Sequence, residues 1–437
     1  MACKSTELIL NHTVNKSVWF FGGDAEDTLE SYLGINNLDI QEDGSKGPTP
    51  FQKITVALKY LLSSQFQQVQ KYVSNILTTF FDRLDHTCPQ PAYDLIEEWI
   101  ATKEGKPQHI WAPVIGKFIQ KVNLEFILKT YPLRVLQSNL DSEDFENESN
   151  SWILPVLRKY LRIDSIKFFL EYFLPVMAGL DDFIYTKPVE RFTEVENTLQ
   201  MIYVQIWEIF PRFCKFTKEN IPFIEQIYDI TAKVIGNRPN VRKHVCQGLE
   251  ILCSYFFKLP KFTNPTMMKT QETLTTCSVK LMPKLCAMYM KDALSSKNII
   301  KLIRTLAGLC SKKYLEDIYL KHINKLLTEK QNNRPYTPIH VKECDILIAM
   351  AGSIDLANNE NDKYDITKKF IRAFLSDKAG FQKRAFKLLE ILSKKVHSSF
   401  LPEMFAILDE TQLVSSSSKL GKLSCILTIL QKMEYSI

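Results

Sequence analysis

Glycine is scarce in this chain, with 14 among 437 residues, which is less than half of the usual share of about 7%. Folds that bind dinucleotides need glycine at their phosphate-binding turns. Two glycine-containing segments, 44–48 and 236–240, lack the spacing of a nucleotide-binding phosphate loop. The composition therefore argues against a Rossmann-type fold and instead suits long helices joined by short turns.

Patterns that carry metal or acid–base chemistry are also missing. The ten cysteines form no C-x-x-C pair, and the seven histidines are dispersed, whereas a metal site needs convergent ligands. His244, Cys246 and Cys253 are close in sequence, but both cysteines lie on an apolar helical face, which favours a core role. Neither a nucleophile elbow nor a grouped acid–base set is found. We expect no enzyme, no metal and no cofactor, and free thiols in a reducing compartment.

Long hydrophobic runs are absent as well. No stretch of 18 apolar residues occurs, and the first residues lack a basic segment followed by a sustained apolar one. Spanning a membrane takes about 20 apolar residues, and a signal peptide needs that basic and apolar order. The sequence therefore predicts a soluble intracellular protein.

Helical periodicity is what the sequence has in abundance. From Phe51 onward apolar residues recur at helical spacing, with short breaks of Pro, Asn, Asp or Ser. The predicted helices are 51–63, 67–85, 91–103, 109–130, 151–162, 165–183, 190–210, 219–236, 240–257, 267–291, 297–310, 314–327, 341–353, 366–375, 380–394 and a pair after residue 400. Helix pairs repeating at about 40 residues indicate an all-α, HEAT- or armadillo-like solenoid, in which each pair covers the apolar face of its neighbour.

Three polar segments stand apart from this pattern. Residues 1–50 hold three lysines and eight acidic residues, a net charge of −5, and end in a linker rich in glycine and proline. We expect them to be a weakly ordered acidic segment, with the solenoid covering 51–437. The acidic stretch 141–150 and the polar stretch 357–363 are predicted to be solvated connectors.

A basic block in the middle of the chain is its main electrostatic feature. Residues 238–325 hold sixteen Lys or Arg and five acidic residues, a net charge of +11, with aromatic residues between them. Such a surface can bind RNA through phosphates, it can bind acidic proteins, or it can simply be a set of solvated helix faces. The candidate RNA-contacting residues are Arg238, Arg242, Lys243, Lys258, Lys261, Lys280, Lys284, Lys297, Lys301, Arg304, Lys312 and Lys313.

Two segments have the character of HEAT repeats. In the first, Pro239 suits a helix start, and Val241, Val245 and Leu249 fall on one face. Arg242 occupies the position where HEAT repeats often hold a basic residue that reaches toward the preceding turn. A second segment, 380–392, repeats this style.

Four ordered motifs resemble the ribosomal RNA processing protein 12 family. They are the Pro-Leu of 132–133 with Ser-Trp-Ile-Leu-Pro-Val-Leu-Arg at 151–158 and Phe-Phe-Leu-Glu-Tyr-Phe-Leu-Pro at 168–175, Gln-Ile-Trp-Glu-Ile-Phe-Pro-Arg-Phe-Cys at 205–214, Arg-Pro-Asn-Val-Arg at 238–242, and Gln-Lys-Arg-Ala-Phe at 382–386. The resembling core covers about 131–390. The motif residues expected to shape the solenoid are Trp152, Pro155, Arg158, Phe173, Pro175, Trp207, Pro211, Cys214, Arg242 and Lys383.

The resemblance implies a HEAT-repeat protein of the nucleolus without a cofactor. Members of this family join small-subunit precursors, support maturation of ribosomal RNA and assist nuclear export of pre-ribosomal particles. They contact pre-ribosomal RNA, assembly factors and the export machinery. The alternative is a generic HEAT adaptor or karyopherin-like transport receptor that binds proteins only.

Overall fold

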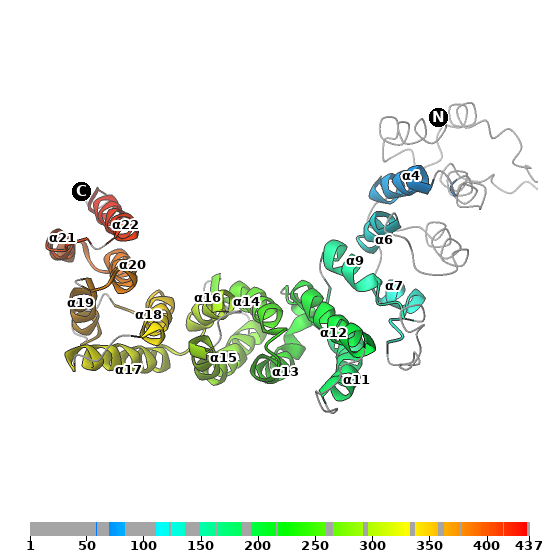
Figure 1. Ribbon diagram of the computed structural model, residues 1–437, viewed down its shortest axis with the longest axis horizontal. Coiled ribbons are helices and arrows are strands. Elements are labelled where there is room, and N and C mark those ends of the chain that lie inside the picture. The colour runs from blue at the N-terminus through cyan, green and yellow to red at the C-terminus, as the bar shows by residue number, and fades with distance from the viewer. Residues whose placement is uncertain are drawn as a thin grey trace, which may run out of the picture. The chain divides into compact units, whose positions relative to one another are not determined.

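The computed structural model of the chain describes a large part of the sequence as helices joined by short turns (Figure 1). The described residues are 58, 70–83, 111–121, 124–135, 149–162, 164–185, 194–215, 217–258, 265–291, 296–332, 337–356, 362–375, 377–413 and 415–434. The acidic segment 1–50, the predicted helix 91–103, and most of 51–63, 141–150 and 357–363 lie outside them. The chain divides into two compact units: Met1–Asp164 with Phe168–Arg212, and Ser165–Lys167 with Phe213–Ile437.

The described helices of the first unit match the predicted ones with two differences. They are α4 (Gln70–Arg83), α6 (Ala112–Ile119), α7 (Leu124–Thr130), α9 (Ile153–Tyr160), α11 (Leu174–Tyr185) and α12 (Glu194–Phe213). The π-helical turn η4 (Phe169–Phe173) precedes α11, and it is preceded by the short helix α10 (Ile166–Phe168), whose first two residues belong to the second unit.

The first difference concerns residues 109–130, where one helix was predicted and two are found. Val114, Ile115 and Phe118 are buried in α6, and Leu124 and Ile127 are buried in α7. At about 100° per residue, a continuous helix would place these two groups on roughly opposite sides. The chain therefore turns between α6 and α7, which lets both groups enter the core.

The second difference is the π-helical turn inside the predicted helix 165–183. Pro175 follows this turn, and a proline in a helix lacks the N–H and crowds the carbonyl four residues back. The backbone widens there, and Leu174 N–H bonds to Phe169 O, five residues away. Phe169 and Phe173 both become fully buried as a result, while the hydroxyl of Tyr172 accepts a hydrogen bond from Leu133 N–H at 3.2 Å.

Five helix pairs build the second unit. The pairs are α13 (Ile224–Asn237) with α14 (Arg242–Lys258), α15 (Pro265–Lys291) with α16 (Ser296–Ala307), α17 (Lys312–Gln331) with α18 (Pro338–Ala351), α19 (Asp362–Leu375) with α20 (Ala379–Lys395), and α21 (Leu401–Asp409) with α22 (Ser416–Glu434). The 3-10 turns η5 (Lys218–Phe223) and η6 (Ser398–Phe400) lead into α13 and α21.

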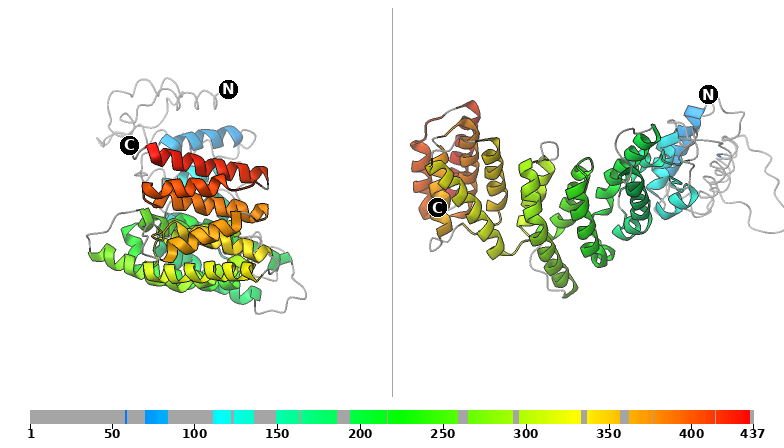
Figure 2. Two further views of the ribbon diagram at one scale, coloured as in Figure 1. Left: turned by 90° about the vertical axis from the view of Figure 1, so that its left-hand side faces the viewer. Right: turned by 60° about the horizontal axis from the view of Figure 1, so that its bottom comes forward.

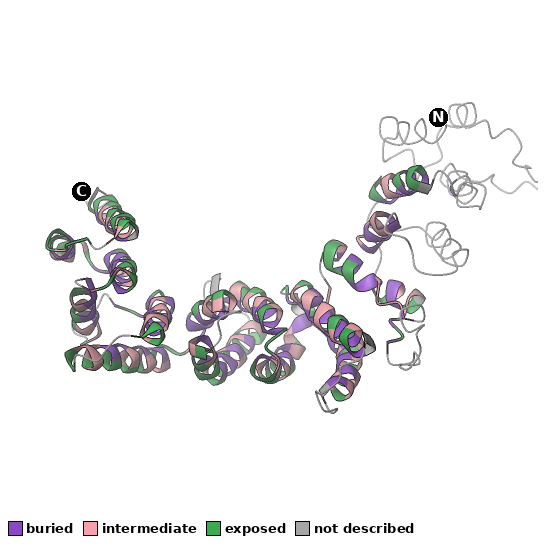
Figure 3. Cartoon of the chain, viewed as in Figure 1, coloured by how far each residue is buried: buried purple, intermediate pink, exposed green. Residues whose placement is uncertain are grey.

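The second helices of these pairs form a continuous layer. Each of α14, α16, α18, α20 and α22 packs on the next, and they follow one another on one side of the unit (Figures 1 and 2). We call these five helices the even layer. We call the first helices of the pairs, which are α13, α15, α17, α19 and α21, the odd layer. Buried residues lie on the sides of the helices that face the other layer, and exposed residues lie on the outer sides (Figure 3). This stacking of pairs is the predicted helical-repeat solenoid.

The core contains the residues that the periodicity placed there. Val241, Val245 and Leu249 have no exposed surface, and neither have Cys246 and Cys253. The eight described cysteines are free thiols and nearly all buried; Cys3 and Cys88 lie outside the described residues. Among the described helices, none has the length and apolar composition needed to cross a membrane.

Candidate nucleic-acid interface

The basic block of the sequence lies on two different faces of the second unit. Lys243 is on α14, and Lys297, Lys301 and Arg304 are on α16, so these four belong to the even layer. Lys280 and Lys284 on α15, with Lys312 and Lys313 at the start of α17, belong to the odd layer. Proximity in sequence therefore does not gather the predicted residues into one patch, because the two helices of a pair present opposite faces to solvent.

The even-layer residues form what we call the basic ridge, defined as Lys243, Lys297, Lys301 and Arg304. All four are exposed, and the three on α16 follow at spacings of four and three residues, which places them on one side of the helix. Lys301 Nζ lies 3.6 Å from Glu250 Oε1 on α14, a weak exposed pair. The ridge therefore crosses from α14 to α16 with its positive charge open to solvent.

Helix α14, which carries Lys243 of the ridge, also has an exposed aromatic side chain. Tyr255 of α14 is 40% exposed, and its ring meets Phe256 edge to face at 5.5 Å. Phe256 and Tyr289, two other aromatic residues of the basic block, are buried. Exposed aromatic rings are the surfaces on which single-stranded bases stack.

The odd-layer candidates have a more balanced surrounding. Lys280 on α15 and two acidic residues of α13, Glu225 and Asp229, all lie close enough to Cys277 for their charges to act on its thiol. Lys312 and Lys313 are exposed at the start of α17, and Glu316 follows one turn later. Mixed charge of this kind favours a solvated face over a phosphate-binding one.

Arg242 does not belong to the candidate RNA-binding surface, because its side chain is buried. Its side chain is 8% exposed, and its Nε–H donates to Ile235 O at 2.8 Å, so it reaches back to the last turn of α13. Arg238, at the end of α13, is half-buried. Lys258 has no described side chain, and Lys261 lies outside the described residues, so neither can be placed on a face.

A second side chain repeats the arrangement of Arg242. The amide nitrogen of Gln382, which is fully buried, donates to Leu375 O at 2.7 Å and to Gln412 O at 2.7 Å. Like Arg242, it bonds to a carbonyl seven residues back, at the end of the preceding helix. The two segments with HEAT character thus share one device that ties the helices of a pair together.

Most motif residues of the first unit shape its structure. The indole N–H of Trp152 donates to Asn150 Oδ1 at 3.3 Å, and the ring of Trp152 meets Tyr131 edge to face at 5.1 Å. Arg158 Nη1 lies 2.7 Å from Glu208 Oε2, which joins α9 to α12. Pro155 lies in the first turn of α9, where a missing N–H costs little.

The remaining motif residues lie in the core, in helix turns or at the surface. Phe173 and Trp207 are buried, and the rings of Trp207 and Phe169 are 5.8 Å apart. Pro175 follows the π-helical turn, and Pro211 lies in the last turn of α12. Cys214 is fully buried, and burial raises the pKa of its thiol well above the usual value. Lys383 is exposed on α20.

One cluster of metal-ligand residue types was not foreseen from the sequence. Glu329, His340 and Glu343 bring ligand atoms within 4.8 Å of one another. His340 Nδ1 accepts a hydrogen bond from Thr337 N–H at 2.9 Å, so its proton is on Nε2, which lies 2.7 Å from Glu329 Oε2. A metal on Nε2 would have to displace that proton while Nδ1 still accepts.

The cluster therefore has a structural role, because its contacts hold α17 and α18 together. His340 and Thr337 form a capping box at the start of α18, and Glu343 Oε1 lies 2.5 Å from Lys325 Nζ on α17. Each contact joins neighbouring helices or caps one of them, while the second carboxylate oxygen of Glu343, Oε2, is buried without a hydrogen-bond partner among the described residues. Among the described residues this is the only such cluster.

Comparison with known proteins shows which family this chain resembles. The model of the family "Ribosomal RNA-processing protein 12, HEAT repeats" matches residues 24–292. The "RRP12-like protein" of Homo sapiens is 23% identical over 336 residues, which cover 73% of this chain and 24% of the relative. The "Ribosomal RNA-processing protein 12" of Saccharomyces cerevisiae is 23% identical over 347 residues, covering 73% of this chain and 27% of the relative.

The chain thus spans about a quarter of the length of these curated relatives. Among solved structures, the crystal structure of Kap121p has a TM-score of 0.48 at 12% identity and covers 99% of this chain and 48% of that one. An engineered protein has a TM-score of 0.37 at 13% identity, with 98% and 99% covered. The family match includes α4 to α15, and it agrees with the observed helix pairs. The chain therefore belongs to the family of the HEAT repeats of ribosomal RNA-processing protein 12.

Proposed function

We propose that this chain works in ribosomal RNA processing as a non-catalytic scaffold, and that its basic ridge binds pre-ribosomal RNA. The observation that carries the proposal is the basic ridge, which lies on a chain whose family is named for ribosomal RNA processing. Small-subunit assembly factors would bind elsewhere on the solenoid. The nucleolus is the expected location, and support of particle export is the expected later role.

The chemistry of the ridge suits a phosphate backbone. Lysine and arginine side chains bind phosphates with little choice of sequence, and the affinity comes largely from released counterions. Lys297 and Arg304 have no ion-pair partner among the described residues, and Lys301 has only the long contact to Glu250. Tyr255, at another position of α14, also exposes a ring on which an unpaired base can stack. Single-stranded segments of precursor RNA are therefore the expected ligand.

The experiment compares two charge-reversed forms of the full chain. The ridge variant carries Lys297→Glu, Lys301→Glu and Arg304→Glu, and the odd-layer variant carries Lys280→Glu, Lys284→Glu and Lys312→Glu. Both change the net charge equally, so non-specific attraction falls equally. Binding of a labelled single-stranded precursor RNA is measured by fluorescence anisotropy over a range of salt concentrations.

The expected result follows from counterion release. A single strand releases about 0.7 counterions for each phosphate contact, so the loss of three contacts lowers the salt slope by about 2. At about 0.15 M salt this corresponds to a roughly 50-fold loss of affinity for the ridge variant, with a much smaller loss for the odd-layer variant. Equal losses in the two variants, or a larger loss in the odd-layer variant, would contradict the proposed RNA face.

The alternative function is an adaptor or transport receptor that binds proteins only. It predicts that the wild-type chain has no measurable affinity for RNA at moderate salt, while it still binds acidic proteins in a salt-dependent way. The same titration with wild-type chain therefore separates the two functions.

A further inference from the structure

The last helix of the even layer, α22, has an apolar outer side. Five large apolar side chains of this helix are exposed, whereas no other described helix exposes more than two. Four of the five are leucines, and we call them the leucine stripe: Leu420, Leu423, Leu427 and Leu430. They are 71%, 61%, 58% and 46% exposed. Scattered apolar residues are ordinary on a protein surface, but a contiguous group of them marks an interaction surface.

The stripe runs along one side of α22. Its leucines follow one another at spacings of three, four and three residues. At about 100° per residue they fall within an arc of roughly 80°. Leucines that alternate between these two spacings form the seam along which one helix packs on another. The stripe is therefore suited to receive a second helix along its length.

The opposite side of α22 is held on α20. A Cβ atom built at Gly421 would lie 3.1 Å from Phe386 Cβ, so the two helices approach closely there. The thiol of Cys425 donates to Phe386 O at 3.0 Å, and Lys432 Nζ donates to Lys394 O at 2.9 Å. Since Gly421, Cys425 and Lys432 lie roughly opposite the stripe on the helix, α22 cannot turn its leucines toward α20 without breaking these contacts.

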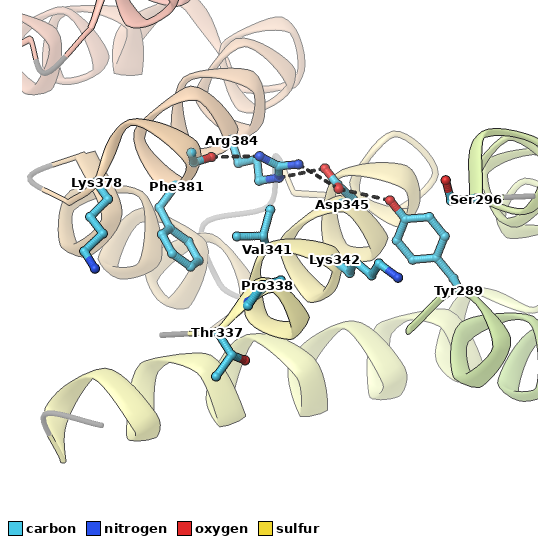
Figure 4. Close-up of a pocket in the computed structure, with 11 residues that line it drawn as sticks. Tyr289, Ser296, Thr337, Pro338, Val341, Lys342, Asp345, Lys378, Phe381 and Arg384 are labelled. Atoms are coloured by element: carbon cyan, nitrogen blue, oxygen red, sulfur yellow. Dashed lines mark hydrogen bonds and ion pairs between the residues drawn. The ribbon is translucent and has the colours of Figure 1, made fainter. Parts of the chain in front are cut away.

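The rest of the even layer shows how such a side is normally covered. Arg384 of α20 donates from Nε and Nη2 to the two carboxylate oxygens of Asp345 on α18, at 2.8 and 2.9 Å, and the hydroxyl of Tyr289 donates to the same carboxylate at 3.0 Å (Figure 4). Helices α16 and α20 each pack between two other helices of the layer, and neither exposes a large apolar side chain. The leucine stripe is therefore the side on which a further helix would continue the layer.

The spacing of the stripe favours a second copy of this chain as that occupant. The series of three, four and three residues reads the same in both directions. In an antiparallel pair of α22 helices related by a two-fold axis, Leu420 of one copy faces Leu430 of the other, and Leu423 faces Leu427. Every leucine of the stripe then packs on a leucine, which is what a self-complementary contact requires.

The charges of α22 favour the antiparallel direction. Lys419 and Lys422 lie near the N-terminal end, where the helix dipole is also positive. Residues 423–431 contain no charged side chain, and the cores of protein interfaces are depleted of charge. An antiparallel pair sets the basic end of each helix beside the negative dipole end of the other. A parallel pair would instead bring four lysines and two positive helix ends together.

We propose that two copies of this chain associate through the leucine stripes of their α22 helices, packed antiparallel. The contact joins the even layers of two second units. A helix of another protein is the competing occupant, but it would not need a stripe that reads the same in both directions. The inference goes beyond the scaffold function and does not depend on RNA binding, because no residue of the basic ridge takes part.

Sedimentation equilibrium of the full chain, treated with nuclease to remove bridging RNA, measures this association. The chain has a mass of 50.6 kDa, and a dimer has twice that mass. A single helix pair is a small interface, so we expect a Kd on the order of 10 µM. Leu423→Lys and Leu427→Glu, each made alone, put an unpaired charge at the centre of the apolar contact and should weaken association roughly 50-fold or more.

A matched control uses an exposed apolar residue away from the stripe. Met268 of α15 is 48% exposed, and Met268→Lys adds the same charge to the chain as Leu423→Lys. Its Kd should stay within about twofold of wild type, since an exposed position outside the contact makes no contribution to it. Circular dichroism confirms that each variant is folded.

Mixing the two charged variants tests the pairing itself. In the antiparallel register the ammonium of the Leu423→Lys chain faces the carboxylate of the Leu427→Glu chain, while the remaining leucines at these two positions still face each other. An equimolar mixture should therefore associate roughly tenfold more tightly than either variant alone. A mixture that associates no more tightly than the separate variants would contradict the antiparallel register.

Three further outcomes overturn the proposal. A wild-type chain that stays monomeric at about 100 µM would mean that another protein covers the stripe. Charged variants that dimerise like wild type would place the contact elsewhere on the chain. Association that disappears after nuclease treatment would mean that RNA bridges the copies. The RNA titration of the ridge variant tests the scaffold function separately, so either result can fail without the other.

Discussion

Replacing Arg242 with alanine separates a structural role from an RNA-binding one. The residue is 8% exposed and donates from Nε to Ile235 O at 2.8 Å. A hydrogen bond from a charged group contributes about 1.5–3 kcal/mol, and the carbonyl of Ile235 would lose this side-chain donor. We therefore expect the second unit to lose about 2–3 kcal/mol of stability.

The structure allows this loss to be located. All five tryptophans, at positions 19, 99, 111, 152 and 207, belong to the first unit, so their fluorescence reports unfolding of that unit. Circular dichroism at 222 nm reports the helices of both. For a unit of this size each kcal/mol lowers the Tm by about 2–4 °C, so the circular dichroism transition of the second unit should fall by roughly 5–10 °C. The tryptophan transition should stay unchanged.

Two further variants control for packing and charge. Arg242→Met keeps the aliphatic stem and removes only the donor, so it should retain part of the stability. Lys243→Ala changes the exposed neighbour and should stay within about 0.5 kcal/mol of wild type. An Arg242→Ala chain that melts like wild type but binds RNA more weakly would refute the structural role and return Arg242 to the RNA-contacting set.

Three other predictions test the packing, the acid stability and the thiols. Gly116→Ala places a methyl against the ring of Tyr160 and should destabilise the first unit by about 1–3 kcal/mol. Urea unfolding followed by tryptophan fluorescence should show that adding Tyr160→Ala recovers part of this loss. An additive loss of stability in the double variant would contradict the steric overlap. Burial lowers the pKa of His322, so the unfolded chain binds its proton at a higher pH than the native chain, and stability falls as the pH drops through about 6.5. His322→Gln should therefore flatten the decrease of Tm between about pH 7 and 5, and an unchanged slope would count against it. Burial raises the pKa of Cys253 and of Cys344 to about 12. These thiols should therefore resist alkylation at about pH 8 until the chain is unfolded. Rapid labelling of these two residues in the native chain, mapped by mass spectrometry, would contradict this prediction.

The helices could be predicted because burial imposes one period on the sequence. Val241, Val245 and Leu249 follow that period, and all three lie in the core. The break between α6 and α7 and the π-helical turn before Pro175 were missed for a related reason. In both places the apolar positions shift phase or crowd together within a few residues, and the chain adjusts its backbone locally to bury them.

The surface sites were less accessible to sequence reasoning. The basic block is contiguous in sequence, but its lysines alternate between the layers because α15 and α16 belong to different layers. Tyr289, Asp345 and Arg384, which line one cavity of the second unit, come from three helix pairs. No local spacing connects them, so only the stacking of the pairs could reveal the cavity.

Photocrosslinking of the full chain to single-stranded pre-ribosomal RNA, with peptides mapped by mass spectrometry, tests the central claim most directly. The account predicts crosslinks in α14 and α16, with Tyr255 and the peptides that carry Lys297, Lys301 and Arg304 among them. Crosslinks confined to the odd layer, or absent from residues 238–325 altogether, would contradict an RNA-binding even layer.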